Sequence, residues 1–160
     1  MIEICLVKKE ESTILNKMLQ LYLHDISSYF QMEFNSEIGE YEYDSLEKYF
    51  TNNGNYAYFI KNDKHIVGFS LVDADDSEIS IQEMFIMNGY KSKGIGKEAV
   101  FSIFNKHKGN WTVKSLPNSQ KAEIFWNRTI KEYTKNNYDT ERVGKYNRAI
   151  FTFSNININE

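Results

Sequence analysis

The sequence predicts a mixed α/β fold, built on a twisted sheet of about six to seven strands with helices on both faces. Three strand-like segments follow one another closely between residues 56 and 87, which favours an antiparallel meander. A strand, a helix and a strand then follow in order between residues 78 and 115, and this order implies one parallel β-α-β pair. A length of 160 residues is typical of one domain, so we expect residues 1–160 to form a single unit.

The first third of the chain combines one strand with two helices. Residues 2–7 are strand-like, and Ser12 is placed to cap the helix that follows. We expect a loop over residues 35–43 and a short helix over residues 45–50. The apolar positions that recur at helical spacing after Ser12 are Ile14, Leu15, Met18, Tyr22, Ile26, Tyr29 and Phe30.

The strands of the meander are separated by tight turns. We expect the strands over residues 56–61, 65–72 and 78–87, with a hairpin turn signal at Asn62-Asp63 and a second turn over residues 73–77. Side chains alternate between the two faces of a strand, so the third strand places Glu83 on the same side as its apolar neighbours. Those neighbours are Ile79, Ile81 and Phe85.

The last third of the chain returns to helices and ends in a hairpin. We expect a helix over residues 97–107, a strand over residues 110–115 and a helix that begins at Asn118. Residues 138–143 and 148–154 have the pattern of two paired strands. The apolar stripe of the second helix consists of Ala122, Phe125, Trp126, Thr129, Ile130 and Tyr133.

Composition and charge exclude several classes of protein. The net charge of -3 argues against a nucleic-acid binder or a protein of anionic membrane surfaces, since both need a basic surface. Cys5 is the single cysteine, so we expect no intramolecular disulfide and a cytoplasmic location. No apolar run approaches the roughly 18 residues that span a bilayer, and the N-terminus does not resemble a signal peptide. The polar tail, residues 155–160, is expected to fray.

The most informative segment is the glycine-containing turn from Tyr90 to Lys97. It lies between a predicted strand and the N-terminus of a predicted helix, where free backbone N–H groups and the helix dipole favour an anion. Gly94 and Gly96 let the backbone approach such a ligand closely. The turn therefore predicts a phosphate site.

Two common phosphate-binding motifs fit this turn poorly. A Walker loop requires Gly-Lys-Ser/Thr at its end, but Ile95 and Gly96 follow Gly94. Gly94, Gly96 and Ala99 match the glycine pattern of a dinucleotide-binding motif. That motif also needs a carboxylate about 20 residues later to bind the ribose, and residues 112–115 contain no carboxylate. A nucleotide-binding enzyme stays open as an alternative, distinguished by preferential binding of NAD or ATP.

The turn resembles the coenzyme A pyrophosphate loop of the GNAT (GCN5-related N-acetyltransferase) superfamily, whose signature is Arg/Gln-x-x-Gly-x-Gly/Ala. Lys91, Gly94 and Gly96 occupy those positions, with lysine in place of the usual arginine or glutamine. The predicted order of elements also matches that family's fold over nearly the whole chain. The phrase Ala122-x-x-Phe-Trp-x-x-x-Ile130, followed by Glu132-Tyr133-Thr134, is similar to a poorly characterised bacterial branch of the family.

The resemblance implies acetyl-CoA as the acetyl donor and no metal. Its pyrophosphate would lie at residues 93–97 and its pantetheine arm along the strand at residues 84–86. Asn118 would contact pantetheine, although capping of the helix explains it equally well, and Trp126 would line the channel or pack in the core. The residues expected to bind the cofactor are Met84, Phe85, Ile86, Lys91, Ser92, Lys93, Gly94, Ile95, Gly96, Lys97, Asn118 and Trp126.

Catalysis in this family needs a base for the amine proton and often uses a tyrosine to protonate the sulfur. Glu83 is the candidate base, because a carboxylate on an apolar face has a raised pKa. A solvated Glu83, or one paired with a lysine, is the alternative. Trp126 stands where the family has its tyrosine, so Tyr133 is a replacement candidate for the acid.

The resemblance implies an N-acetyltransferase that acts on a primary amine of a small molecule or a protein, as a monomer or homodimer. Five carboxylates among aromatic residues 22–43 would suit a cationic amine, or would form a solvated loop. They are Asp25, Glu33, Glu37, Glu40 and Glu42. A GNAT-like domain that binds acyl-CoA without turnover is the alternative function, and it stays open because the family tyrosine is replaced.

Overall fold

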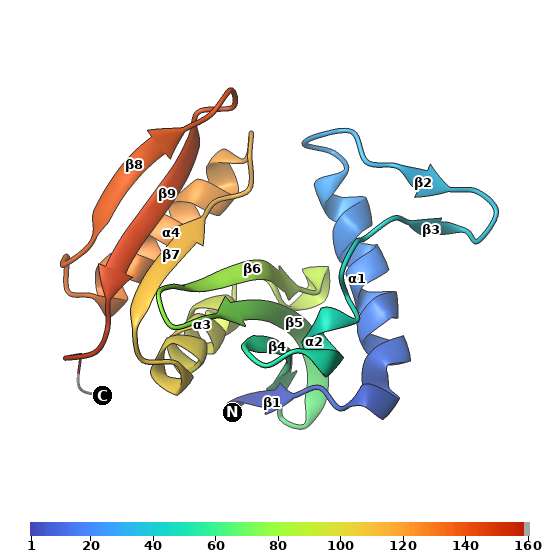
Figure 1. Cartoon of the computed structure of the whole chain (residues 1–160), viewed down its shortest axis with the longest axis horizontal. Helices are drawn as coiled ribbons and strands as arrows, with labels where there is room; N and C mark the ends of the chain where they lie inside the picture. The colour runs from blue at the N-terminus through green and yellow to red at the C-terminus, as the bar shows by residue number, and fades with distance from the viewer. Residues whose placement is uncertain (159–160) are drawn as a thin grey trace.

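A computed structural model describes residues 1–158 and shows one mixed sheet with helices on both faces (Figure 1). The strands β4, β5 and β6 form the predicted antiparallel meander, and β6 and β7 form the predicted parallel pair. In spatial order the seven strands of this sheet are β1 (Ile2–Leu6), β4 (Asn55–Asn62), β5 (His65–Ala74), β6 (Ile79–Ile86), β7 (Asn110–Lys114), β9 (Arg148–Ser154) and β8 (Asp139–Val143). The predicted fold class is confirmed.

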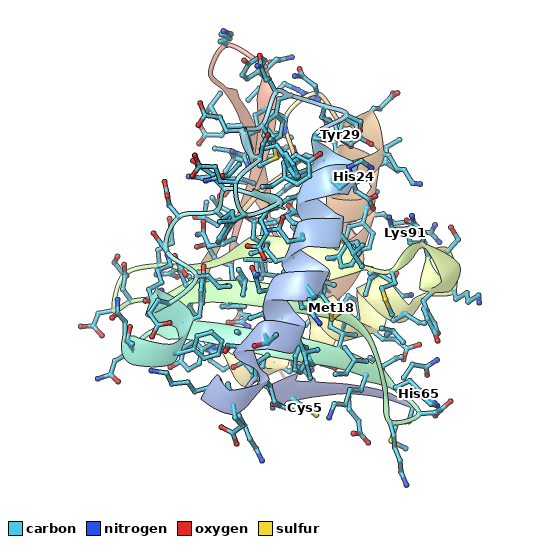
Figure 2. All side chains as sticks on the ribbon, turned by 90° about the vertical axis from the view of Figure 1, so that its right-hand side faces the viewer. Cys5, Met18, His24, Tyr29, His65 and Lys91 are labelled. Atoms are coloured by element: carbon cyan, nitrogen blue, oxygen red, sulfur yellow. The ribbon has the colours of Figure 1, made fainter. Side chains whose placement is uncertain are left out.

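Two apolar cores lie on opposite faces of the sheet. Helix α1 (Ser12–Ile26) and the short helix α2 (Lys48–Thr51) pack with β4 and β5 on one face. Helices α3 (Ile95–Lys106) and α4 (Gln120–Tyr133) pack on the other, around the buried Trp111. Figure 2 shows α1 crossing in front of the strands. No helix within residues 1–158 is long and apolar enough to cross a membrane.

Short elements connect these layers. The segment between α1 and α2 contains a small hairpin of β2 (Phe34–Asn35) and β3 (Glu40–Tyr41), where the sequence predicted only a loop. The 3₁₀ turns are η1 (Lys9–Glu11), before α1, and η2 (Asn88–Tyr90), after β6. The turn η2 leads β6 into the glycine segment.

The sheet opens between β6 and β7. The two strands pair at one position only, Ile79 with Trp111, and then diverge. Figure 1 shows β7, β9 and β8 leaning away from the β4-β5-β6 group. Residues 81–86 of β6 therefore have a sheet partner on the β5 side alone. An edge of this kind carries unpaired backbone N–H and C=O groups that can pair with an extended ligand.

A β-bulge in β6 decides which way its side chains point. In the pairing with β5, Val72 lies opposite Ile81 and Leu71 lies opposite Glu83, so Gln82 has no opposite residue. An extra residue of this kind exchanges the two faces of a strand. Ile81 packs in the α3 and α4 core, whereas Glu83 and Phe85 lie on the α1 face. The prediction that Glu83 shares a side with Ile79 and Ile81 is thus wrong, because strict alternation ignores the bulge.

Several predicted boundaries also need correction. Ser12 is the first residue of α1 and not its cap, because the 3₁₀ turn η1 precedes it, and α1 ends at Ile26, before Tyr29 and Phe30. Ser119, not Asn118, caps α4, and its Oγ accepts a hydrogen bond from the N–H of Ala122 at 3.2 Å.

The beginning of the tail is ordered instead of frayed. Asn155 is fully buried, and its side chain accepts a hydrogen bond from the N–H of Gly109 at 2.8 Å and donates one to the carbonyl of Phe104 at 2.7 Å. A side chain that satisfies backbone groups of two other segments anchors the chain after β9. Residues 159–160 of the predicted tail lie outside the described residues.

We predict that Gly68→Ala destabilises the protein. A Cβ at Gly68 would lie 2.2 Å from the carbonyl oxygen of Phe85, so β5 and β6 would have to move apart where Gly68 pairs with Ile86. The expected loss is about 1–3 kcal/mol of unfolding free energy, measured by urea denaturation. Gly89→Ala is the control, because a Cβ there meets nothing within 4 Å. Equal stability of both variants would contradict the tight approach of β5 to β6.

Candidate active site

One large cavity follows the opening of the sheet. Its volume is about 1160 Å³. Residues 81–86 of β6 line it, together with the end of α1, the glycine turn before α3, the first turns of α4 and residues just after β7. The cavity therefore joins the predicted phosphate turn to the diverging strands.

The glycine turn has the geometry of an anion site. Gly94 adopts a left-handed conformation with φ of 79° and directly precedes α3, which begins two residues earlier than predicted. The N–H of Glu98 bonds to the carbonyl of Gly94 at 3.1 Å, so the first-turn N–H groups of residues 95–97 are left for a ligand. A Cβ on Gly96 would come within 3.3 Å of the ring of Phe125, so a glycine here lets α3 and α4 approach each other.

The lysines of the turn are held by neighbouring groups. The Nζ of Lys91 donates to Asn88 at 2.6 Å and lies 3.4 Å from a carboxylate oxygen of Asp25 on α1. Lys97 forms an ion pair with Glu132 at 2.9 Å. Figure 2 shows Lys91 beside the upper part of α1. Because both pairs are solvent-exposed, each contributes at most about 1 kcal/mol, and phosphate oxygens can replace the carboxylates.

The cavity gathers nine of the twelve residues predicted to bind the cofactor. Lys93, Ile95 and Asn118 are not part of its lining. Lys93 bonds to the carbonyl of Gly89 at 2.9 Å, Ile95 is buried in a small apolar core, and Asn118 donates to the carbonyl of Tyr29 at 3.4 Å. The nine that line the cavity are Met84, Phe85, Ile86, Lys91, Ser92, Gly94, Gly96, Lys97 and Trp126.

The two aromatic residues of α4 considered for catalysis lie in different places. Trp126 is 7% exposed, packs in the core and also contributes to the wall of the cavity. Tyr133 lies farther along α4 and is not part of that wall. Its hydroxyl donates to Asn105 at 2.8 Å, within the core between α3 and α4. The structure thus does not bring Tyr133 to Glu83.

Glu83 lies in the cavity wall and accepts two hydrogen bonds from tyrosines. Tyr22 of α1 donates to one carboxylate oxygen at 2.5 Å, and Tyr43 donates to the other at 3.2 Å. Burial raises the pKa of Glu83 above its ordinary value, while the two hydroxyls and the charge of Arg148 act in the opposite direction. Because burial dominates, the carboxylate is a better proton acceptor than an exposed glutamate.

Both tyrosines stay neutral and so remain donors. Burial, with the nearby carboxylate of Glu83, raises the pKa of Tyr22 and of Tyr43 well above the ordinary value of a phenol. The sequence pattern placed Tyr22 in an apolar stripe and both tyrosines in the aromatic segment of residues 22–43, but it did not predict their contact with Glu83. Tyr22 lies 61 residues and Tyr43 lies 40 residues before Glu83 in the sequence, so no local pattern could have predicted these contacts.

Arg148 and Lys114 also line the cavity and were not predicted. Arg148 opens β9, and its Nε donates to the carbonyl of Ser115, just after β7. By contrast, of the five carboxylates predicted near the acceptor, only Asp25 reaches the wall. Glu40, for example, accepts a hydrogen bond from Asn16 at 3.1 Å.

These features define an α/β protein whose sheet opens beside a glycine turn at a helix N-terminus, with a partly buried carboxylate at the same opening. The model of the acetyltransferase (GNAT) family matches residues 22–128. The chain belongs to that family, as the resemblance of the glycine turn implied.

Known proteins similar to this chain extend the comparison. A UPF0637 protein of Staphylococcus epidermidis is 28% identical over 126 residues, which cover 76% of this chain and 60% of that relative. The chain thus spans less than two thirds of the curated relatives that it matches.

Solved structures share the fold at low identity. An acetyltransferase of Thermus thermophilus has a TM-score of 0.69 and 10% identity, and the match covers 96% of both chains. The PaiA N-acetyltransferase of Thermoplasma acidophilum, in complex with coenzyme A, has a TM-score of 0.62 and 14% identity, covering 96% of this chain and 99% of that one. At such identities the likeness concerns the fold alone.

We predict that Tyr22→Phe raises the pKa of Glu83 further, because the substitution removes a hydroxyl that stabilises the carboxylate. A carboxyl-carbon NMR titration measures this pKa directly. In the unsubstituted protein Glu83 should titrate above its ordinary value. Tyr41→Phe is the control, since the hydroxyl of Tyr41 lies 3.1 Å from His24 instead. A lower pKa in Tyr22→Phe would contradict the assignment.

Proposed function

We propose that the protein is an N-acetyltransferase that transfers an acetyl group from acetyl-CoA to a primary amine by direct attack. One observation carries the proposal: a single cavity connects the glycine turn at the start of α3 to the partly buried carboxylate of Glu83 along an open strand edge. These are the three features that this transfer needs, namely a place for phosphates, a track for an extended arm and a base.

The donor half of the site is supported by the turn and by family membership. The pyrophosphate would lie at residues 94–97, held by backbone N–H groups and by the cations of Lys91 and Lys97. The amide-containing pantetheine arm would pair with β6 at residues 84–86, the part of the strand that has no partner toward β7. A structure of similar fold, from Thermoplasma acidophilum, is a complex with coenzyme A, which supports coenzyme A as the kind of ligand.

The acceptor half is supported by the environment of Glu83. An amine attacks only when it is neutral, so a base must remove its proton, and the raised pKa of Glu83 suits that step. A backbone N–H of the open part of β6 would stabilise the oxyanion of the tetrahedral intermediate. We assign no general acid, since Trp126 lacks a suitable proton and Tyr133 bonds with Asn105 in the core. The thiolate would take its proton from solvent.

A binding module for acyl-CoA without turnover is the second candidate function. Its specific support is Trp126, which stands in the cavity wall where the family often has a tyrosine. Both functions require binding of acetyl-CoA, and only the first produces free coenzyme A when an amine is added. Release of thiol across a panel of primary amines separates the two functions.

We predict that Gly94→Ala weakens binding of acetyl-CoA by about tenfold or more in isothermal titration, because a Cβ would stand where a phosphate approaches. The matched control is Gly144→Ala in the β8–β9 turn. Both glycines have positive φ, 79° and 69°, and neither position has an atom within 4 Å of an added Cβ. The backbone strain is therefore comparable, and only Gly94→Ala should lose affinity. Equal affinities of the two variants would contradict the phosphate site.

We predict that Glu83→Gln lowers kcat/KM by about 10²–10⁴-fold, the usual contribution of a general base. In the unsubstituted protein kcat/KM should rise with pH through the raised pKa of Glu83, because only the ionised carboxylate accepts a proton. The variant should lack this rise. Glu78→Gln is the control, because Glu78 bonds with Thr112 outside the cavity. An unchanged pH profile in Glu83→Gln would refute the role of Glu83.

A further inference from the structure

An arginine without an ion pair within residues 1–158 lies in the wall of the cavity that contains the candidate base. The side chain of Arg148 is partly buried, and its Nε bonds to the carbonyl of Ser115. Within residues 1–158 its two terminal nitrogens make no hydrogen bond, and no carboxylate lies within ion-pair distance of them. In an open cavity water solvates these free donors, and an anionic ligand can replace that water with charge-assisted hydrogen bonds.

The strand register places a second cation on the same face. Ala149 and Phe151 pack in the core under α4, so Arg148 and Ile150 point to the opposite face of β9. Lys114 lies directly opposite Ile150 in the pairing of β7 with β9. Lys114 and Arg148 are thus neighbours on the face turned away from α4, and both line the cavity that contains Glu83.

Arg148 belongs to the Glu83 side of the cavity and not to the phosphate turn. Its charge acts on both Glu83 and Tyr22. It also comes from β9, whereas the phosphate-binding groups come from the turn before α3. The donor phosphates already have the N–H groups of that turn, so Arg148 and Lys114 are left for the other substrate.

The acidic groups of the cavity do not offset these cations. Asp25 and Glu83 are the two carboxylates in its wall, and Asp25 is already paired with Lys91. Glu83 is occupied by two tyrosine hydroxyls and is not within ion-pair distance of Arg148. A purely cationic acceptor would therefore meet an unpaired arginine.

We propose that Arg148, assisted by Lys114, binds an anionic group of the acceptor, so that the preferred substrates are amines that also carry a carboxylate or a phosphate, as amino acids do. The inference rests on the proposed acetyltransferase function and narrows its substrate class. The guanidinium would hold the anion while Glu83 takes the proton of the amine. A bidentate contact of this kind also orients the nitrogen toward the donor.

The test uses pairs of amines that differ in the anionic group. Suitable pairs are phenylalanine with phenethylamine, leucine with isopentylamine, and phosphoethanolamine with ethanolamine. We expect kcat/KM, measured by thiol release with saturating acetyl-CoA, to favour the anionic member of at least one pair by about tenfold or more. The amino-acid pairs and the phosphate pair separate the two sources of the anion.

Variants separate recognition from a structural role. Arg148→Met should abolish the preference mainly through KM of the anionic amine and keep the affinity for coenzyme A. Loss of its charge also raises the pKa of Glu83, so both amines are compared at a pH above that pKa, where the plain amine should change less than the anionic one. Arg148→Lys should restore part of the preference, because it keeps the charge without the bidentate geometry. Arg142→Met is the control, since Arg142 lies in the same hairpin but bonds to Glu123 of α4. A wild-type preference for plain amines in every pair would overturn the inference, as would an equal loss for both members in Arg148→Met.

A binding measurement keeps this inference distinct from the proposed function. The protein saturated with coenzyme A is titrated with N-acetylphenylalanine, N-acetylphenethylamine and the corresponding phosphate pair. Tighter binding of an anionic product, lost in Arg148→Met, supports the inference even if turnover is slow. Binding of coenzyme A with no preference between the products overturns the inference alone. Failure to bind coenzyme A overturns the proposed function and the inference with it.

Discussion

One extra residue in β6 decides where the reactive carboxylate lies. Without the bulge at Gln82, alternation would turn Glu83 toward α3 and α4, into the apolar core that contains Ile79 and Ile81. With the bulge, Glu83 faces α1, where Tyr22 and Tyr43 donate to both of its oxygens. The raised pKa, the contact with α1 and the position at the cavity all follow from this change of register.

The bulge acts together with the divergence of β6 and β7. A continuous sheet would cover the edge of β6 and leave no room for a ligand, whereas pairing at Ile79 and Trp111 alone opens the strand as far as residue 86. The glycine turn and Arg148 both line the cavity at this opening. The glycine turn, the open edge and the carboxylate therefore form one site and not three separate features.

Sequence patterns predicted the parts of this protein that depend on local chemistry. Apolar periodicity and turn residues located the meander, α3, α4 and the final hairpin within a few residues, and the two glycines of the turn line the cavity. Apart from shifted helix boundaries and caps and the small β2–β3 hairpin, the errors came from contacts between distant residues. The face of Glu83 depends on a bulge that alternation does not reveal, and Asn155 is ordered by bonds to Gly109 and Phe104 that its polar neighbours did not suggest. Neither Tyr43 nor Arg148 could be identified from its neighbours in the sequence. Tyr43 contacts Glu83, 40 residues away, and Arg148 reaches the cavity only because β9 lies beside β7 in the folded sheet.

The central claim is that the open edge of β6, between the glycine turn and Glu83, is where the donor binds. Hydrogen exchange of the backbone amides, with and without acetyl-CoA, tests this claim most directly. The account predicts slower exchange at residues 84–86 and 95–97 on binding, with little change in the β8–β9 hairpin. Protection confined to other parts of the chain, with residues 84–86 unaffected by saturating acetyl-CoA, would contradict it.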